Sequence, residues 1–249
     1  HLTVNKEPLE TAKNQLQANI DQKPSTDGMT QQSVQSYQRK LQEAKDKINS
    51  INNVLANNPD VSAIRTNKVE AEQINNELTQ AKQGLTVDKQ PLINAKTALQ
   101  QSLDNQPNTT GMTQATIQTY NAKRQKAEQA IQKANKVIEN AQPSVQQVSA
   151  EKSKVEQALN ELNNAKSALR ADKEELQHAY DQLIQPTDLN NKKPATINAY
   201  NQRYQQFSNE LNNTKTNADR ILKEQNPSVA NINNALNKVR EVQQKLNEA

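Results

Sequence analysis

The sequence has few of the residues that build most globular cores and active sites. Its 249 residues include no cysteine, no tryptophan, three glycines and one phenylalanine, and only 33% are apolar. The lack of cysteine excludes disulfides and thiolate metal sites. Three glycines are too few for a sheet protein with many tight turns, or for glycine-rich phosphate-binding loops. No apolar run reaches the roughly 18 residues that cross a membrane.

Polar amides and interspersed charges take the place of these residues. The chain has 34 asparagines and 33 glutamines, and its 31 basic and 27 acidic residues give a net charge of +4. The densest basic spots, Lys123–Arg124 and Lys192–Lys193, are each two residues long. A nucleic-acid-binding surface would gather basic residues on one face with aromatics between them. We therefore expect no nucleic-acid partner.

One unit occurs three times along the chain. The segment Leu2–Leu9 returns as Leu85–Leu92, and the turn Asp27–Gln31 returns as Thr110–Gln114. Self-similarity at a fixed period is the mark of a repeat architecture. The predicted repeats are 1–84, 85–168 and 169–249. The third has diverged most, and aligning its Tyr200 with the earlier repeats requires a gap of about four residues, which is regained before the next proline.

Each repeat contains three segments in which apolar residues recur at spacings of three and four. This period places one apolar residue per turn on a single helix face, which decides against disorder. In the first repeat these positions are Leu9, Ala12, Leu16, Ile20, Val34, Tyr37, Leu41, Ala44, Ile48, Ile51, Leu55, Ala71, Ile74, Leu78 and Ala81. The pattern predicts an all-α fold of tandem three-helix bundles.

Helix ends are marked by capping residues and prolines. Thr30 and Thr113 are the predicted N-caps of the second helix of their repeats, and Met29 is placed to pack on Val34 as a hydrophobic staple. Between the second and third segments, a proline stops one helix and opens the next. These prolines are Pro59, Pro143 and Pro227.

The connections between repeats determine the predicted architecture. The apolar seam runs in phase from Val155 through Asp172 to Leu183, and neither glycine nor proline interrupts 168–183. The sequence therefore predicts one continuous helix there, whereas Gly84 and Pro91 favour a kink or break at the first connection, with Asp88 as an N-cap. Bundles that share long connecting helices would stack end to end into a rod.

Three motifs together resemble the FIVAR-type repeat family: the Pro-Leu start of the first helix, the Gly-Met-Thr-Gln turn, and the Asn/Gln-Pro-x-Val start of the third helix. The resemblance implies a tandem array in a cell-wall-associated extracellular adhesin. It also implies matrix proteins such as fibronectin as partners. The third repeat departs from the family at Lys192–Pro194, so a ligand site built from that turn would be absent there.

No catalytic, cofactor or metal site emerges from the residues. His178 is the only internal histidine, and we expect it on a solvated face without a second ligand. Glu174 and Glu175 follow Asp172 in a predicted first helical turn, where a role in supporting the helix outweighs paired-carboxylate catalysis. The sequence predicts a protein that is not an enzyme, and the ligand-binding residues stay unassigned.

Aromatic and methionine side chains are the remaining candidates for contact with a partner. Tyr37, Tyr120 and Tyr200 are predicted to fill the same buried position near the start of the second helix. Tyr180, Tyr204 and Phe207 enlarge the core of the third repeat or form a binding patch. Met29 and Met112 are predicted as staples rather than exposed contact points.

Three functions fit this sequence. The first is a monomeric spacer segment of a surface adhesin, which also offers a possible matrix-binding region. The second makes the repeats ligand-binding modules for a plasma protein or a cell-wall glycan polymer. The third is an intracellular coiled-coil scaffold, which predicts self-association through exposed apolar residues.

Overall fold

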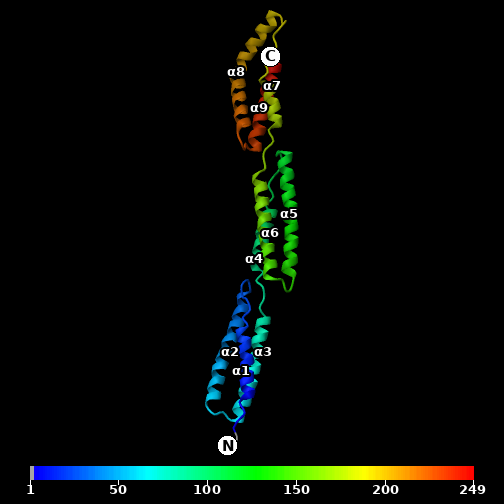
Figure 1. The fold of residues 1–249 in the computed structure, drawn as a ribbon. Coiled ribbons are helices and arrows are strands. Elements are labelled where there is room, and N and C mark those ends of the chain that lie inside the picture. Colours follow the sequence, from blue (N-terminus) through cyan, green and yellow to red (C-terminus); the bar gives the residue numbers. More distant parts are fainter. Residues whose placement is uncertain (1–2) are drawn as a thin grey trace. The chain divides into compact units, whose positions relative to one another are not determined.

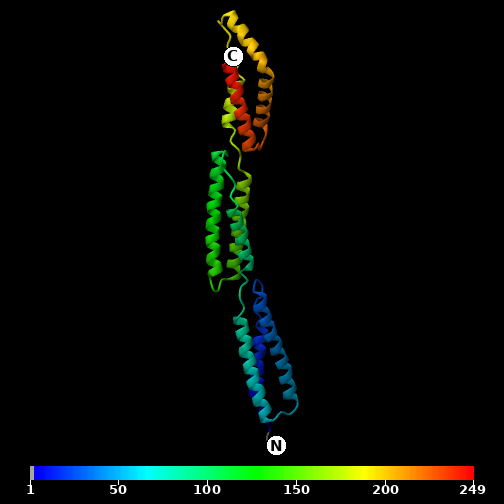
Figure 2. The same ribbon diagram turned by 180° about the vertical axis from the view of Figure 1, so that it is seen from behind.

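The computed structural model describes residues 3–249, and over that range the regular elements are nine α-helices. The all-α prediction is confirmed, and β-structure within the same range is limited to two isolated bridges. Figures 1 and 2 show the helices from opposite sides. They are α1 (Glu7–Asp21), α2 (Gln31–Ala56), α3 (Val61–Gln83), α4 (Gln90–Asp104), α5 (Gln114–Glu139), α6 (Val145–Ser167), α7 (Glu174–Leu183), α8 (Pro194–Lys223) and α9 (Val229–Asn247).

The chain divides into two compact units. The first comprises residues up to 99 together with 130–156, and the second comprises 100–129 together with 157–249. Helices α4, α5 and α6 each begin in one unit and end in the other. The predicted repeat boundaries at 84/85 and 168/169 stay predictions.

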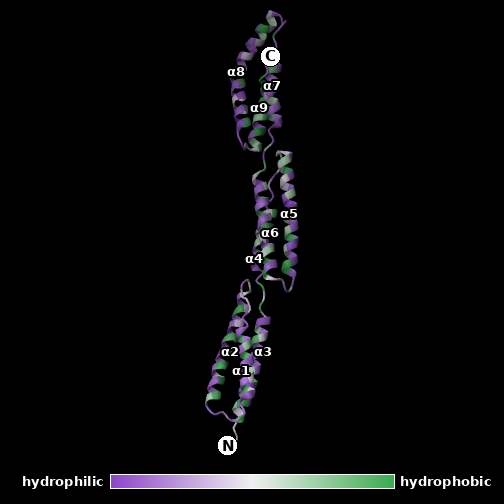
Figure 3. Ribbon diagram, viewed as in Figure 1, coloured by the Kyte–Doolittle hydropathy of each residue, from purple (hydrophilic) through white to green (hydrophobic). Residues whose placement is uncertain are grey.

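In the first unit, α1, α2 and α3 lie side by side as a three-helix bundle (Figures 1 and 2). Most of its buried core residues are predicted seam positions, and Leu9, Leu16 and Leu78 are fully buried. Ile64 is buried without having been predicted, and other predicted positions such as Leu41 are only partly buried. Full burial of such a side chain contributes roughly 1.5–3 kcal/mol. Hydrophobic residues are spaced along each helix among many hydrophilic ones (Figure 3). A narrow apolar stripe on each helix is therefore enough to close the bundle.

In the second unit, α7, α8 and α9 form another bundle of this kind. Leu176, Leu183, Leu211 and Val239 are almost completely buried at its centre. Thr214 is also buried, at 5% exposure. The core of this bundle again follows the spacing of three and four that the sequence shows.

Helix α8 corrects the predicted alignment of the third repeat. It has 30 residues, whereas α2 and α5 each have 26. Counted back from the last helical residue, Tyr204, not Tyr200, occupies the place of Tyr37 and Tyr120. The repeat needs no gap, because α8 begins about one turn earlier and α7 is correspondingly short.

The continuous helix predicted over 168–183 is wrong. Helix α6 ends at Ser167 and α7 begins at Glu174. The intervening residues instead pair with an earlier turn through the bridge between Met112 and Ala171. Asp172 Oδ1 accepts a hydrogen bond of 2.9 Å from the Glu174 amide at the start of α7, and Asp172 lies just before the N-cap residue Lys173 rather than inside a helix. The predicted break at the first connection is confirmed, because α3 ends at Gln83 and α4 begins at Gln90.

The predicted helix starts are largely confirmed. Thr30 Oγ1 accepts from the Ser33 amide at 3.3 Å, and Thr113 Oγ1 from the Thr116 amide at 3.4 Å. The prediction that a proline opens the third helix is wrong, because Pro59, Pro143 and Pro227 lie in the loops and the capping residues follow them. Asp60 caps α3 in this way. Over residues 3–249, no helix combines the length and the apolar character needed to cross a membrane.

Candidate functional site

The recurring Gly-Met-Thr turn lies where one repeat meets the linker to the next. Gly28 has φ +74° and Gly111 has φ +77°, a left-handed conformation that costs glycine little. The residue after each glycine forms an isolated antiparallel bridge, Met29 with Val87 and Met112 with Ala171. The two turns therefore have the same shape and the same kind of partner.

At the first of these junctions, backbone groups of the turn and the linker satisfy one another. The Thr30 amide donates to the Thr86 carbonyl at 2.7 Å, and the Asp88 amide donates to the Gly28 carbonyl at 2.8 Å. The Ser33 hydroxyl accepts from the Thr86 amide at 3.2 Å. In a continuous helix, the backbone amides and carbonyls of these linker residues would be paired within the helix. Here the turn and Ser33 pair them instead.

The second junction, which lies within the second unit, repeats this pattern. The Thr113 amide donates to the Arg170 carbonyl at 2.8 Å, and the Asp172 amide donates to the Gly111 carbonyl at 2.8 Å. The Thr116 hydroxyl accepts from the Arg170 amide at 3.3 Å. The side chains of the two linkers differ at several positions, but their backbone pairing is the same.

Each glycine of these turns also contacts a valine at the start of a later helix. A Cβ atom on Gly28 would lie 2.6 Å from Val145 Cγ1, and one on Gly111 would lie 2.7 Å from Val229 Cγ1. Two carbon atoms that are not bonded to each other do not approach this closely. The positions therefore need glycine twice, for the backbone angle and for the close approach of the valine.

An open cleft lies beside each junction. The first measures about 960 Å³ and is lined by residues of the turn, the linker and the start of α6, including Met29 and Val87. The second measures about 570 Å³ and is lined by the equivalent set, including Met112 and Ala171. Both methionines are half-buried there. These two clefts are the candidate functional sites.

A lysine before the first helix of each repeat caps the second helix. Lys6 Nζ donates to the Leu55 carbonyl at 2.8 Å, and Lys89 Nζ donates to the Ile138 carbonyl at 2.6 Å and to that of Asn140. Lys173 Nζ donates to the carbonyls of Leu222, at 3.1 Å, and Glu224. A cation at these unpaired carbonyls also complements the helix dipole.

A second set of lysines caps the first helix of the repeat. Lys82 Nζ donates to the carbonyls of Asn19 and Gln22, and Lys166 Nζ donates to those of Ser102 and Asn105. Burial lowers the pKa of Lys82 and of Lys166 below the ordinary lysine value. Sequence reasoning missed both sets, although lysine recurs at equivalent positions in the repeats.

Ion pairs join the second and third helices of a bundle at the surface. Lys40 Nζ lies 2.7 Å from Glu77 Oε2, and the hydrogen bond from Lys40 lowers the pKa of Glu77. In the α7–α9 bundle the signs are exchanged, because Glu210 of α8 pairs with Lys238 at 2.6 Å and with Lys245 at 2.7 Å on α9. The hydrogen bonds from these lysines lower the pKa of Glu210.

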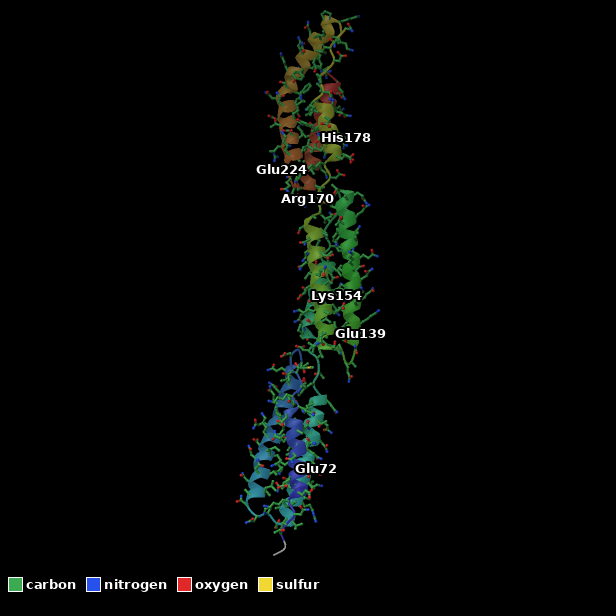
Figure 4. The ribbon with its side chains drawn as sticks, viewed as in Figure 1. Glu72, Glu139, Lys154, Arg170, His178 and Glu224 are labelled. Atoms are coloured by element: carbon green, nitrogen blue, oxygen red, sulfur yellow. The ribbon has the colours of Figure 1, made fainter. Side chains whose placement is uncertain are left out.

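The charged residues considered for catalysis lie at the surface. The His178 side chain is 74% exposed on α7, and its Nε2 is 3.7 Å from Glu174 Oε1 (Figure 4). Glu174 and Glu175 lie in the first turn of α7, as predicted, and Glu175 pairs with Arg240 at 3.2 Å. Among residues 3–249, no three or more His, Cys, Asp and Glu side chains gather where a metal could bind.

The three tyrosines predicted to share one buried position do not all occupy it. Tyr37 and Tyr120 are each 4% exposed, and burial raises the pKa of Tyr37. Tyr200 is only half-buried, and its hydroxyl donates to Thr187 Oγ1 at 2.8 Å. A chain of rings links Tyr200, Tyr204 and Phe207, with centroid separations of 5.9 and 5.8 Å. Tyr180, Tyr204 and Phe207 are partly buried against the core of the α7–α9 bundle, which supports the interpretation that they enlarge the core.

Comparison with known proteins identifies relatives for most of the chain. Its sequence is 44% identical over 203 residues to the extracellular matrix-binding protein EbhB of Staphylococcus aureus strain N315, across 80% of this chain and 5% of that protein. The extracellular matrix-binding protein ebh of strain NCTC 8325 / PS 47 matches equally well over 2% of its length. The chain thus spans a small fraction of the curated relatives it matches.

A solved structure and a family model also match. The structure comes from a characterisation of extracellular matrix binding protein (Embp)-mediated adherence of Staphylococcus epidermidis to fibronectin. It matches 66% of this chain and 99% of its own chain at 30% identity, with a TM-score of 0.25. The FIVAR domain model matches three times, at 12–86, 95–170 and 179–247. Since these three matches together cover most of the 249 residues, the chain belongs to the FIVAR domain family.

Proposed function

We propose that this chain is a repeat segment of an extracellular, cell-wall-associated adhesin that binds a matrix protein of the fibronectin type. The observation that carries the proposal is the succession of three FIVAR matches in a sequence 44% identical to extracellular matrix-binding proteins. The chain covers only a small part of those proteins, so the matrix-binding activity is carried over as a hypothesis.

The segment also serves as a spacer under this proposal. Its three repeats, 1–84, 85–168 and 169–249, are joined by linkers that pair with the preceding turn through backbone hydrogen bonds. Bonds of this kind restrict the flexibility of a linker. Each added repeat therefore extends the reach of the adhesin instead of adding a flexible segment.

A catalytic role is not part of the proposal. His178 is exposed, and the acidic partner that the structure gives it within residues 3–249 is the equally exposed Glu174, an arrangement that does not hold the imidazole in place as a base or ligand. The Asn- and Gln-rich helix faces instead offer many hydrogen-bonding groups for contact with a protein or a wall polymer.

A titration of fibronectin against the immobilised 249-residue chain tests the proposal. Purified cell wall and an unrelated helical protein of similar charge serve as the comparison ligand and the control surface. We expect saturable binding of fibronectin by the chain and none by the control. Saturable binding of cell wall alone would favour the wall-glycan alternative, and binding of neither would contradict the proposal.

Sedimentation of the same preparation tests the monomeric state on which the proposal depends. We expect a mass of about 27.9 kDa across the concentrations used for the titration. A concentration-dependent dimer would favour the coiled-coil scaffold instead.

A further inference from the structure

Three valines occupy equivalent places in the three repeats, but only two of them are covered. Val61, Val145 and Val229 are the first residues of α3, α6 and α9. Val145 lies against Gly28, Val229 lies against Gly111, and both are half-buried. Val61 is 60% exposed. The first repeat therefore presents at its surface the side chain that the other two place against a glycine turn.

The segment before α1 completes this surface, because it reproduces the linkers of the two junctions. Asn5 Oδ1 accepts from the Glu7 amide at 3.0 Å, as Asp88 Oδ1 accepts from the Gln90 amide at 2.9 Å. The capping bond from Lys6 to Leu55 brings the segment beside the loop that leads to Val61. Figure 1 shows the start of α1 next to the α2–α3 connection.

The backbone groups used at the junctions have counterparts in this segment. At the first junction, the Thr86 carbonyl and the Asp88 amide bond the Gly-Met-Thr turn, with Val87 between them in the bridge. The corresponding residues before α1 are Thr3, Val4 and Asn5. Thr3 and Asn5 are exposed, and Val4 packs against the core of the first bundle.

We propose that Val61 together with Thr3–Asn5 forms a docking surface for the Gly-Met-Thr turn of another repeat of this kind. The occupant is defined by chemistry that the chain shows twice. It has a glycine with positive φ that lets the valine approach, a half-buried apolar side chain after it, and a threonine amide that donates to the strand. The inference goes beyond the proposed function, because it concerns contact between repeats and is independent of any matrix ligand.

The third turn of the chain shows why this surface would be selective. Asn191 has φ +61°, and the Lys192 amide donates to the Leu189 carbonyl at 3.4 Å, as the Met112 amide donates to Thr109 at 3.1 Å. The backbone conformation of the turn is therefore kept. However, Asn191 carries the Cβ atom that the valine contact excludes, and Lys193 makes no side-chain capping bond. A turn of this type does not fit the surface.

Thiol labelling tests the proposal, since the chain has no cysteine of its own. The variant Val61→Cys is prepared in three chains: the 249-residue chain, the same chain with a second copy of residues 85–167 fused in front of residue 1, and that fusion with Asn-Lys-Lys replacing Gly-Met-Thr in the added turn. In the fusion, Leu2 stands two residues after the last residue of the added copy. Leu85 and Leu169 likewise stand two residues after the ends of α3 and α6, so the spacing between helix and linker is kept.

We expect labelling at position 61 to be fast in the first chain and at least about tenfold slower in the second, because a docked site reacts only when it opens locally. In the third chain the rate should return to within about twofold of the first. Equal rates in the first two chains, or equal protection by both turns, would overturn the proposal.

A matched internal control separates a failed dock from a failed fold. Val145→Cys in the 249-residue chain should label slowly, because Gly28 already covers this position, and adding Gly28→Asn should make it label rapidly. The labelling contrast at position 61 is then read only for chains whose helical content, measured by circular dichroism, is preserved. If Gly28→Asn leaves position 145 protected, glycine is not the selective element and the proposal fails.

Discussion

The two linkers of the chain reach the same structure from different residues. Residues 84–89 begin with a glycine and lead to Pro91, whereas 168–173 contain neither residue. In both linkers, the carbonyl of the third residue accepts a hydrogen bond from the turn threonine amide, and the aspartate amide donates back to the carbonyl of the turn glycine. The shared element is the Gly-Met-Thr turn, so the turn, rather than a helix-breaking residue in the linker, fixes the conformation.

The energetic reason is that the break leaves few backbone groups without partners. A helix through 168–173 would form its own bonds, but the turn offers equivalent bonds to Arg170 and Asp172. The Arg170 guanidinium also donates to the Ser167 carbonyl at 2.7 Å, at the end of α6. Because buried backbone groups must be paired in either case, the choice between helix and linker depends on contacts that lie far apart in sequence.

Replacing a turn glycine should have the largest effect of the changes considered. Gly28→Val and Gly111→Val place a β-branched residue at positive φ and force it against Val145 or Val229. Strain of about 1–2 kcal/mol from the backbone and about 1–3 kcal/mol from overpacking should together lower the free energy of unfolding. Urea unfolding followed by circular dichroism measures the loss.

The third turn supplies the control for this experiment. Asn191→Gly keeps the positive φ and should change the free energy of unfolding by no more than about 0.5 kcal/mol. The two glycine variants should also differ in one respect. Freed from its turn, 168–173 should gain helical backbone chemical shifts in Gly111→Val, whereas Gly84 and Pro91 should prevent this for 84–89 in Gly28→Val. A gain of helix in both linkers, or in neither, would contradict the expected difference between them.

Local pattern was sufficient to predict much of the fold. Seam residues of the first repeat such as Leu9, Leu16 and Leu78 were identified by spacing alone and are fully buried in the bundle core. The caps Thr30 and Thr113 and the break before α4 were also predicted. These features depend on neighbours within about one helical turn, which is the range over which sequence spacing carries information.

The features that sequence reasoning missed depend on partners that are distant along the chain. The second linker is broken by a turn more than fifty residues earlier, as the bond from Arg170 to Thr116 shows. Tyr204 replaces Tyr200 as the equivalent of Tyr120 because α8 lengthens while α7 shortens. The candidate clefts were missed for the same reason. The Gly-Met-Thr and Pro-x-Val motifs were recognised, but nothing in their spacing reveals that they meet.

Replacing the lysine that ends each linker should have the next largest effect on the free energy of unfolding. Lys89→Met and Lys173→Met remove a cation that bonds two helix-terminal carbonyls, and Lys6→Met removes one that bonds a single carbonyl. We expect the first two to lower the free energy of unfolding by about 1–2 kcal/mol, and the last by less. The exposed Lys45→Met is the matched control in urea unfolding. Equal losses for the control and the capping lysines would show that the linkers are not held by these bonds.

Replacing the lysines that precede the linkers, Lys82 and Lys166, should change the free energy of unfolding least. The pH dependence of stability in these variants tests whether the two junctions are alike. Burial lowers the pKa of Lys82 and Lys166 from the ordinary value of 10.5, so the unfolded chain binds these protons more tightly than the folded chain does. Stability should therefore rise with pH between the lowered pKa and 10.5. Lys82→Met and Lys166→Met should each remove a similar part of this rise.

Nuclear magnetic resonance titration of the lysine Cε groups measures the two pKa values directly. Both capping lysines hold carbonyls at the end of the first helix of their repeat, through the bonds to Gln22 and Asn105, and both should titrate below the ordinary lysine value of 10.5. A lowered pKa at Lys82 alone would mean that the lysine before the first linker is more deeply buried than the lysine before the second. The common turn would then be insufficient to make the two junctions alike, and Gly84 and Pro91 would have to contribute.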